Sequence, residues 1–96
     1  MSARARLSRA DVLDSAKKLV TQDRTKTHGD IDDLFSMIAR SWSAKLGITV
    51  TPEQVSLLLA DLKTCRAWRN PLHGDNWKDG AGYFALGAEL AGALDD

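Results

Sequence analysis

The chain has 96 residues, enough for one hydrophobic core but too few for two independently folding domains. Hydrophobic residues make up 44% of it, which is normal for a globular protein and argues against a disordered chain. The 13 Lys and Arg residues are balanced by 13 Asp and Glu residues, so the net charge is zero. Non-specific nucleic-acid binding, which requires a basic face, is therefore not expected.

The cysteine content and the apolar stretches indicate a cytoplasmic protein without membrane association. Cys65 has no second cysteine with which to form an internal disulfide, as is usual in a reducing compartment. The first ten residues lack the apolar run of a signal peptide. The longest mostly apolar stretch, residues 81–88, is far shorter than the roughly 18 residues that suggest a membrane span.

The N-terminal part of the chain predicts a tail followed by a helix. Residues 1–7 contain arginines and no acidic residue, and we interpret them as a flexible tail before a single domain over residues 8–96. Ser8 and Asp11 have the spacing of a capping box, and apolar residues then recur at helical spacing. A first helix is therefore expected over residues 9–21.

A polar segment over residues 22–29 separates this helix from a second one, which is predicted over residues 31–46. Gly47 has the position of a helix-terminating glycine. The core face of this helix follows the i, i+3, i+4 pattern and comprises Ile31, Leu34, Phe35, Ile38 and Trp42.

The start of the third helix carries the clearest boundary signal. Thr51 has the N-cap position, Pro52 the first helical position and Gln54 the third. The helix is expected to end at residue 69, because Asn70 precedes a proline and so avoids the helical region. Its predicted buried face comprises Val55, Leu58, Leu59, Leu62 and Cys65.

A fourth helix is predicted over residues 75–94, and its middle is rich in glycine and alanine. Glycine costs roughly 1 kcal/mol relative to alanine inside a helix, so a run of small residues indicates that another backbone approaches closely. One face carries Ala81, Ala85, Ala88 and Gly92, which we interpret as a packing surface within the monomer or across a homodimer. The expected fold is thus all-α, an antiparallel four-helix domain that forms a dimer.

The tripeptide His-Gly-Asp occurs twice, at residues 28–30 and 73–75, and contains both histidines of the chain. Each copy stands where a loop gives way to a helix, with its aspartate as a candidate N-cap. If consecutive helices run up and down, both copies and the end of the third helix meet at one pole of the bundle.

This His-Gly-Asp pole is the candidate site. Its expected ligand-binding residues are Arg24, His28, Lys63, Arg66, Asn70 and His73. The carboxylates that could bind a metal ion, with Mg²⁺ as the candidate cofactor, are Asp30, Asp33, Asp75 and Asp79. Trp68 and Trp77 are either core residues or able to stack on a base. A simpler interpretation stays open, because capping and the helix dipole also favour acids at helix starts and cations at helix ends.

Taken together, these residues resemble a family of short all-α proteins of unknown function encoded by tailed phages and prophages. The resemblance covers residues 9–92 and is carried by Asp23-Arg24, His28-Gly29-Asp30, Trp42 with Leu46-Gly47, Thr51-Pro52-Glu53, Leu62-Lys63 with Arg66, Asn70-Pro71 with His73 and Asp75, and Trp77-Lys78-Asp79 with Gly82-Tyr83. It implies a protein of the infected or lysogenic bacterial cytoplasm.

A weaker resemblance is to all-α nucleoside triphosphate pyrophosphatases of the MazG type. It implies that the two pairs of aspartates hold Mg²⁺ against a nucleotide, although the Glu-x-x-Glu helix of those enzymes is absent here.

Three functions follow as expectations. The first is binding of a phosphorylated, nucleotide-like small ligand at the His-Gly-Asp pole. The second is a metal-dependent nucleotide pyrophosphohydrolase. The third is a non-enzymatic protein-interaction module in which the polar pole only stabilises the fold.

Overall fold

The computed structural model describes residues 5–23 and 30–96, and all regular structure in these residues is helical. In chain order the elements are α1 (Arg9–Lys18), the π-helical turn η1 (Leu19–Asp23), α3 (Ile31–Leu46), α4 (Pro52–Arg69) and α5 (Gly74–Ala91). The prediction of an all-α fold with four α-helices is confirmed for this part of the chain. None of these helices is long and apolar enough to traverse a lipid bilayer.

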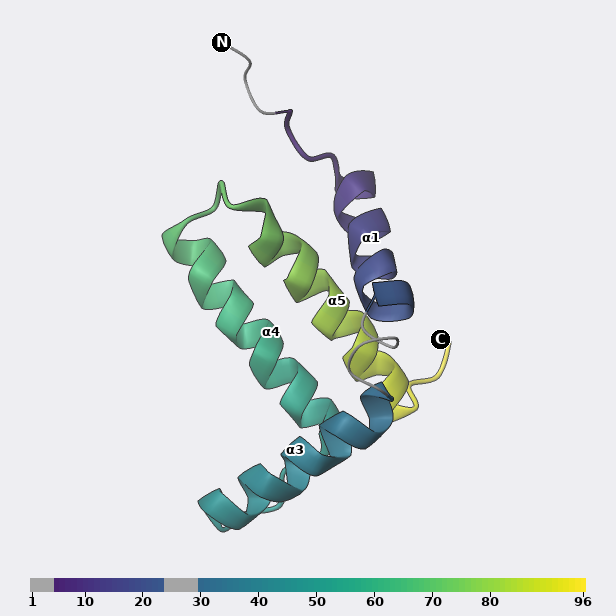
Figure 1. Ribbon diagram of the computed structural model, residues 1–96, viewed down its shortest axis with the longest axis vertical. Helices are drawn as coiled ribbons and strands as arrows, with labels where there is room; N and C mark the ends of the chain where they lie inside the picture. The colour runs from purple at the N-terminus through teal and green to yellow at the C-terminus, as the bar shows by residue number, and fades with distance from the viewer. Residues whose placement is uncertain (1–4, 24–29) are drawn as a thin grey trace.

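The hairpin of α4 and α5 organises the molecule (Figure 1). These two helices are antiparallel and are joined by a short turn over residues 70–73, while α3 crosses the opposite, open end of the hairpin. The segment before α1 meets the start of α5, where a Cβ built on Gly74 would lie 2.8 Å from Leu7 Cδ1. The segment after α1 meets the middle of α5, where a Cβ on Gly82 would lie 3.1 Å from Val20 Cγ1. Helix α1 therefore runs parallel to α5.

Local capping explains where the helices begin. The Ser8 N–H donates to Asp11 Oδ2 and the Asp11 N–H donates to Ser8 Oγ, both at 3.0 Å, so the predicted capping box of α1 is present. At the start of α3 the Asp30 carboxylate accepts the N–H of Asp32 at 2.8 Å. At the start of α4 the Thr51 N–H donates to Gln54 Oε1 at 3.0 Å. Three helix starts are thus fixed by side chains within four residues of the boundary.

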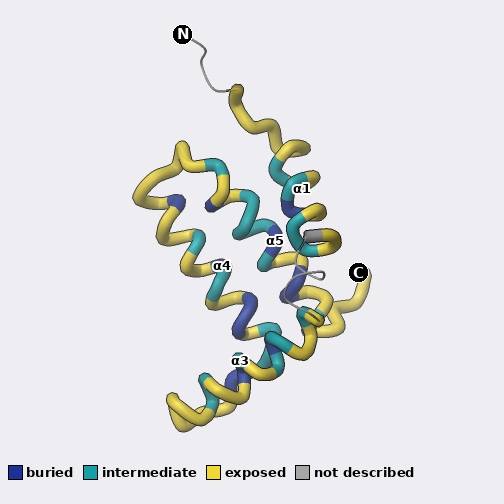
Figure 2. The backbone as a smooth tube through the Cα atoms, in the orientation of Figure 1, coloured by how far each residue is buried: buried dark blue, intermediate teal, exposed yellow. Residues whose placement is uncertain are grey.

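The hydrophobic core lies where α3 crosses the hairpin (Figure 2). Its buried residues come from α3, the turn after it, α4 and α5 and are Phe35, Ala39, Val50, Val55 and Leu86. The predicted core face of α3 is confirmed, because its remaining members are partly buried against this cluster. The Ser43 hydroxyl holds the turn after α3 by accepting the Val50 N–H at 2.8 Å and donating to the Val50 carbonyl at 3.2 Å.

The contact between α4 and α5 is made by small residues, which corrects the predicted buried face of α4. Leu58 and Leu62 are 50% and 44% exposed and Cys65 is exposed as well. Val55 is buried as predicted and Leu59 is partly buried against the core, but the other buried residues of α4 are the small Ser56, Ala60 and Ala67. Small side chains let the two backbones approach closely, and Leu58 and Leu62 lie on the exposed side of α4. The Ser56 hydroxyl even donates to the Tyr83 carbonyl of α5 at 2.6 Å.

The glycine positions of α5 also differ in part from expectation. Gly82 and Gly87 are buried, and a Cβ on Gly87 would lie 3.5 Å from the Ser56 Cβ, so close packing at glycines is confirmed. The specific face predicted to pack, however, does not pack within the monomer, because Ala85, Ala88 and Gly92 are exposed. The side of α5 that packs against the core instead carries Leu86.

Candidate functional site

The aspartates of the two His-Gly-Asp segments, Asp30 and Asp75, do not lie at one pole, although the predicted site assumes that they do. Asp75 lies in the first turn of α5, whereas Asp30 begins α3 at the end of the hairpin where α5 finishes (Figure 1). Helix α5 has 18 residues, and at 1.5 Å per residue the two ends are about 27 Å apart. The prediction failed because it assumed that each helix runs opposite to the next, whereas α1 runs parallel to α5 and α3 crosses the hairpin. Arg24 and His28 lie outside the described residues.

The four predicted metal ligands are therefore not brought together. Asp30 caps α3 and Asp33 is exposed in the first turn of that helix, while Asp75 and Asp79 belong to the N-terminal half of α5. Over residues 5–23 and 30–96, no group of three or more His, Cys, Asp and Glu side chains is arranged to hold a metal ion. In the described residues the two aspartate pairs thus do not form one Mg²⁺ site, and binding of Mg²⁺ by either pair stays a prediction.

Lys63 and Asp79 are bonded to each other. The distance from Lys63 Nζ to Asp79 Oδ2 is 3.0 Å, and the two side chains are only 14% and 22% exposed. This ion pair links α4 to α5 beside Gly80, whose Cβ would lie 3.7 Å from the Lys63 Cβ. Lys63 was expected to bind a ligand and Asp79 to bind a metal. In the structure their ion pair connects α4 to α5.

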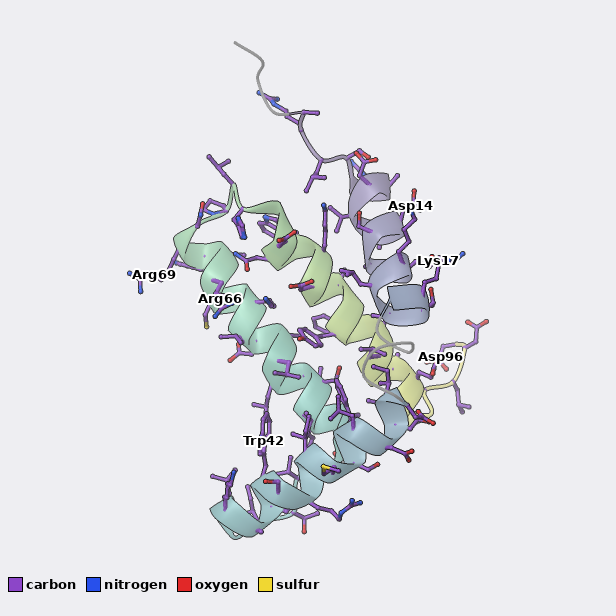
Figure 3. All side chains as sticks on the ribbon, in the orientation of Figure 1. Asp14, Lys17, Trp42, Arg66, Arg69 and Asp96 are labelled. Atoms are coloured by element: carbon purple, nitrogen blue, oxygen red, sulfur yellow. The ribbon has the colours of Figure 1, made fainter. Side chains whose placement is uncertain are left out.

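The remaining predicted residues lie around the tip of the hairpin. Arg66 is exposed in the last turns of α4, where Figure 3 shows the Arg69 side chain directed away from the helices. Asn70 is the C-cap of α4. His73, and not Asp75, is the N-cap residue of α5, and its side chain makes no capping hydrogen bond. The second His-Gly-Asp copy therefore starts its helix differently from the first.

The described residues form an open groove that runs along the N-terminal half of α5, between α1 and the end of α4. Its volume is about 1540 Å³. Large apolar side chains with 42% to 93% exposure line it, and they are Leu7, Leu13, Trp68, Leu72, Trp77 and Phe84. We refer to this surface as the α5 groove.

The walls of the α5 groove are held by the hairpin itself. The Trp77 indole Nε1–H donates to the Pro71 carbonyl at 2.8 Å, which fixes the indole against the turn. Trp68 projects from the last turns of α4 and is 87% exposed. Leu13 belongs to α1, so three helices contribute to the surface. Such aromatic side chains are the residues most often found at the energetic centre of protein interfaces.

The charges along the α5 groove are mainly positive. Arg6, Arg9 and Lys78 line it, together with Lys63, whose charge is offset by Asp79. Asp75 is the acidic residue among the groove-lining residues. The backbone N–H and the hydroxyl of Ser8 lower the pKa of nearby Asp11, and the positive charge of Lys78 lowers it further.

The α5 groove was not among the sites predicted from the sequence. Its signal was a second apolar stripe on α5, since Trp77, Ala81 and Phe84 have i, i+4, i+7 spacing and share a face. That stripe lies on the opposite side of α5 from Gly82 and Leu86, which pack inward. Because only the side with Gly82 and Leu86 packs inside the domain, the apolar side with Trp77, Ala81 and Phe84 is available to bind a partner.

Comparisons with known proteins give a family but no solved structure. A family model described as a domain of unknown function (DUF6378) matches residues 11–91. The Gene 55 protein of Mycobacterium phage L5 is 34% identical over 76 residues, which cover 78% of this chain and 49% of the phage protein. The chain thus spans about half the length of this curated relative. No solved structure matches.

Proposed function

The chain belongs to the DUF6378 family, a phage protein family of unknown function, and we propose that it acts as a non-enzymatic protein-interaction module. A partner protein of the bacterial cytoplasm would dock in the α5 groove. This is the third of the functions considered from the sequence, and the placement of the exposed apolar residues favours it over the other two.

The observation that carries the proposal is the gathering of exposed apolar side chains in one concave surface. Among the described residues, 13 large hydrophobic side chains are exposed, and six of them line the α5 groove. Single exposed leucines are normal on protein surfaces, but a contiguous apolar surface rimmed by charges is typical of a binding face. Three of the six are aromatic, as expected for interface anchors.

The size of the groove favours a macromolecular partner over a small ligand. Small-molecule sites are enclosed clefts of about 300–1,000 Å³ that cover most of the ligand surface. The α5 groove is larger than this range, at about 1540 Å³, and is open to solvent. A nucleotide would leave most of its apolar lining exposed.

A selection from a random peptide library displayed on phage tests the proposal. We expect enriched peptides that bind the wild-type chain, and we expect Trp68→Ser and Phe84→Ser each to weaken that binding at least tenfold. Leu46→Ser is the matched control, because Leu46 is 63% exposed, close to the 62% of Phe84, but lies outside the groove. Enriched peptides that bind both groove variants as tightly as the wild type would contradict a docking role for this surface.

A second candidate function is binding of a phosphorylated, nucleotide-like ligand at the tip of the hairpin. The observation in its favour is the exposure of Arg66 and His73 there, beside Asn70. A thermal-shift screen against nucleotides, with and without Mg²⁺, tests it. Arg66→Lys should remove the ligand-induced stabilisation without lowering the stability of the free protein, because lysine lacks the bidentate fork. The pyrophosphohydrolase alternative has no comparable support, because its carboxylates lie at two ends of α5.

We also propose that the chain forms a homodimer through the outer side of α4. Leu58, Leu62 and Cys65 are exposed at i, i+4, i+7 spacing and make an apolar stripe that no other described helix covers. Leu62→Lys should halve the mass measured by analytical ultracentrifugation, while Trp68→Ser should leave it unchanged. A wild-type chain that sediments as a monomer at high concentration would contradict the proposal.

A further inference from the structure

We infer that the segment bound in the α5 groove is an acidic, amphipathic α-helix of about three turns from a partner protein. This inference rests on the proposed function, and it adds the secondary structure and the charge of the partner segment.

The arrangement of the helices favours a helical partner. In the upper half of the molecule α1, α5 and α4 lie side by side with α5 in the middle, and α3 covers only the far end (Figure 1). The apolar stripe of α5 faces the groove at Trp77, Ala81 and Phe84. A helix laid along this stripe, between the flanking α1 and α4, would complete a four-helix arrangement with apolar residues in its centre.

The available alternatives fit less well. An extended peptide is usually bound by adding a strand to the edge of a sheet, and the described residues contain no strand. A helix bound in a groove places its own apolar anchors at i, i+3, i+4 and i+7, and such a row of anchors would lie along the apolar stripe of Trp77, Ala81 and Phe84 on α5. The part of α5 that lines it, residues 74–84, rises about 15 Å at 1.5 Å per residue, which corresponds to three helical turns.

The charge of the lining favours an acidic partner. Arg6 and Arg9 stand at the start of α1, and Lys78 stands on α5 at the same end of the groove. Asp75 is the acid that lines the groove with them, and Asp11 lies close enough to Lys78 to offset part of its charge. The whole chain is neutral, so the positive excess is local to this surface. Complementary charges on a partner would speed association and fix its orientation.

Single-stranded nucleic acid is the competing occupant, because cations and aromatic rings also bind phosphates and bases. The lining favours a peptide, since Leu7, Leu13 and Leu72 contribute aliphatic surface that bases do not use. The indole of Trp77 is also tied by its hydrogen bond to Pro71 and lies half exposed in the wall of the groove.

Three peptide libraries on phage, with identical apolar positions, test the inference. In the first the remaining positions of an 11-residue helix are rich in Glu, in the second they are rich in Lys, and in the third a central Pro prevents helix formation. We expect the Glu-rich library to yield the tightest binders. A selected Glu-rich peptide should bind an Arg9→Glu, Lys78→Glu variant about tenfold more weakly, and the same peptide with Glu replaced by Lys should recover binding to that variant.

The controls separate a failure of this inference from a failure of the proposed function. Binders from the Lys-rich or Pro-containing library that equal the Glu-rich ones would overturn the inference, as would a thymidine oligonucleotide that displaces the selected peptide from the groove. If no library yields a binder that is lost in Trp68→Ser, the groove is not a docking surface and the proposed function fails as well.

Discussion

Two neighbouring glycines of α5 should respond in opposite directions when each is replaced by alanine. Both Gly80 and Gly82 lie inside the helix, where alanine is favoured over glycine by about 0.5–1 kcal/mol. The difference lies in what the new Cβ meets. At position 80 the nearest atom is the Lys63 Cβ at 3.7 Å, which is ordinary van der Waals contact. At position 82 it is Val20 Cγ1 at 3.1 Å, a tight contact that requires Val20 to shift by a few tenths of an ångström.

The expected magnitudes follow from these distances. Gly80→Ala should keep the helix-propensity gain and raise Tm by roughly 2–8 °C, since 1 kcal/mol corresponds to about 4–8 °C in a domain of this size. Gly82→Ala should lose that gain and more, because overpacking costs about 1–3 kcal/mol and the branched Val20 side chain has little rotamer freedom. We expect it to destabilise the protein by about 1 kcal/mol.

Thermal unfolding followed by circular dichroism measures both effects. Val20→Ala supplies the control, because Gly82→Ala should become harmless or stabilising once the valine methyl groups are removed. A Gly82→Ala variant that is stabilised as much as Gly80→Ala, in the presence of Val20, would refute the close contact between η1 and α5. The parallel placement of α1 along α5, and with it one wall of the groove, would then be wrong.

Further predictions concern the hairpin and the capping of α1. Asp79→Asn should lower the free energy of unfolding in urea by about 1–3 kcal/mol, because it leaves a mostly buried lysine without its partner; an unchanged urea midpoint would mean that the ion pair is not structural. At protein concentrations low enough for the chain to be monomeric, Val55→Ala should cost about 2 kcal/mol because Val55 is fully buried, whereas Leu58→Ala should cost under about 1 kcal/mol because Leu58 is half exposed; the reverse order would restore the predicted leucine face of α4. The hydrogen bonds from Ser8 lower the pKa of Asp11, so the contribution of this carboxylate to stability is present above its ordinary value of 3.8 and is lost as the pH falls through its lower value in the folded protein. NMR should therefore show α1 loosening at acidic pH in the wild type, and Asp11→Asn should remove that dependence.

Local features of the chain could be predicted from the sequence and long-range ones could not. The bounds of α3 and α4 follow from caps and periodicity within a few residues, and Phe35 lies in the core as its helical spacing indicates. The inner face of α4 was predicted only in part, at Val55 and Leu59, because hydrophobicity points to Leu62, whereas close approach of α5 requires the smaller Ser56. Burial of that face depends on a partner 27 residues away in the chain.

The candidate site illustrates the same limit. The two His-Gly-Asp tripeptides are identical in sequence, yet Asp30 caps its helix by a side-chain hydrogen bond while the second copy begins its helix at His73. Their separation is set by the direction in which α1 packs against α5, and no local pattern encodes that direction. Lys63 and Asp79 were predicted as ligand-binding and metal-binding residues. Their ion pair could not be predicted because it depends on how α4 packs against α5.

The three tryptophan indoles provide the most direct test of the α5 groove as a docking surface. Trp68 and Trp77 line the groove. Trp42 lies on α3, away from the groove, and is partly buried against the hydrophobic core (Figure 3). Each indole N–H gives its own signal in a ¹⁵N-labelled protein, so a titration with a selected Glu-rich peptide can be followed at all three. The signals of Trp68 and Trp77 should shift and that of Trp42 should stay in place. A shift confined to Trp42, or no shift at Trp68 and Trp77 when the peptide is bound, would contradict a docking role for the groove.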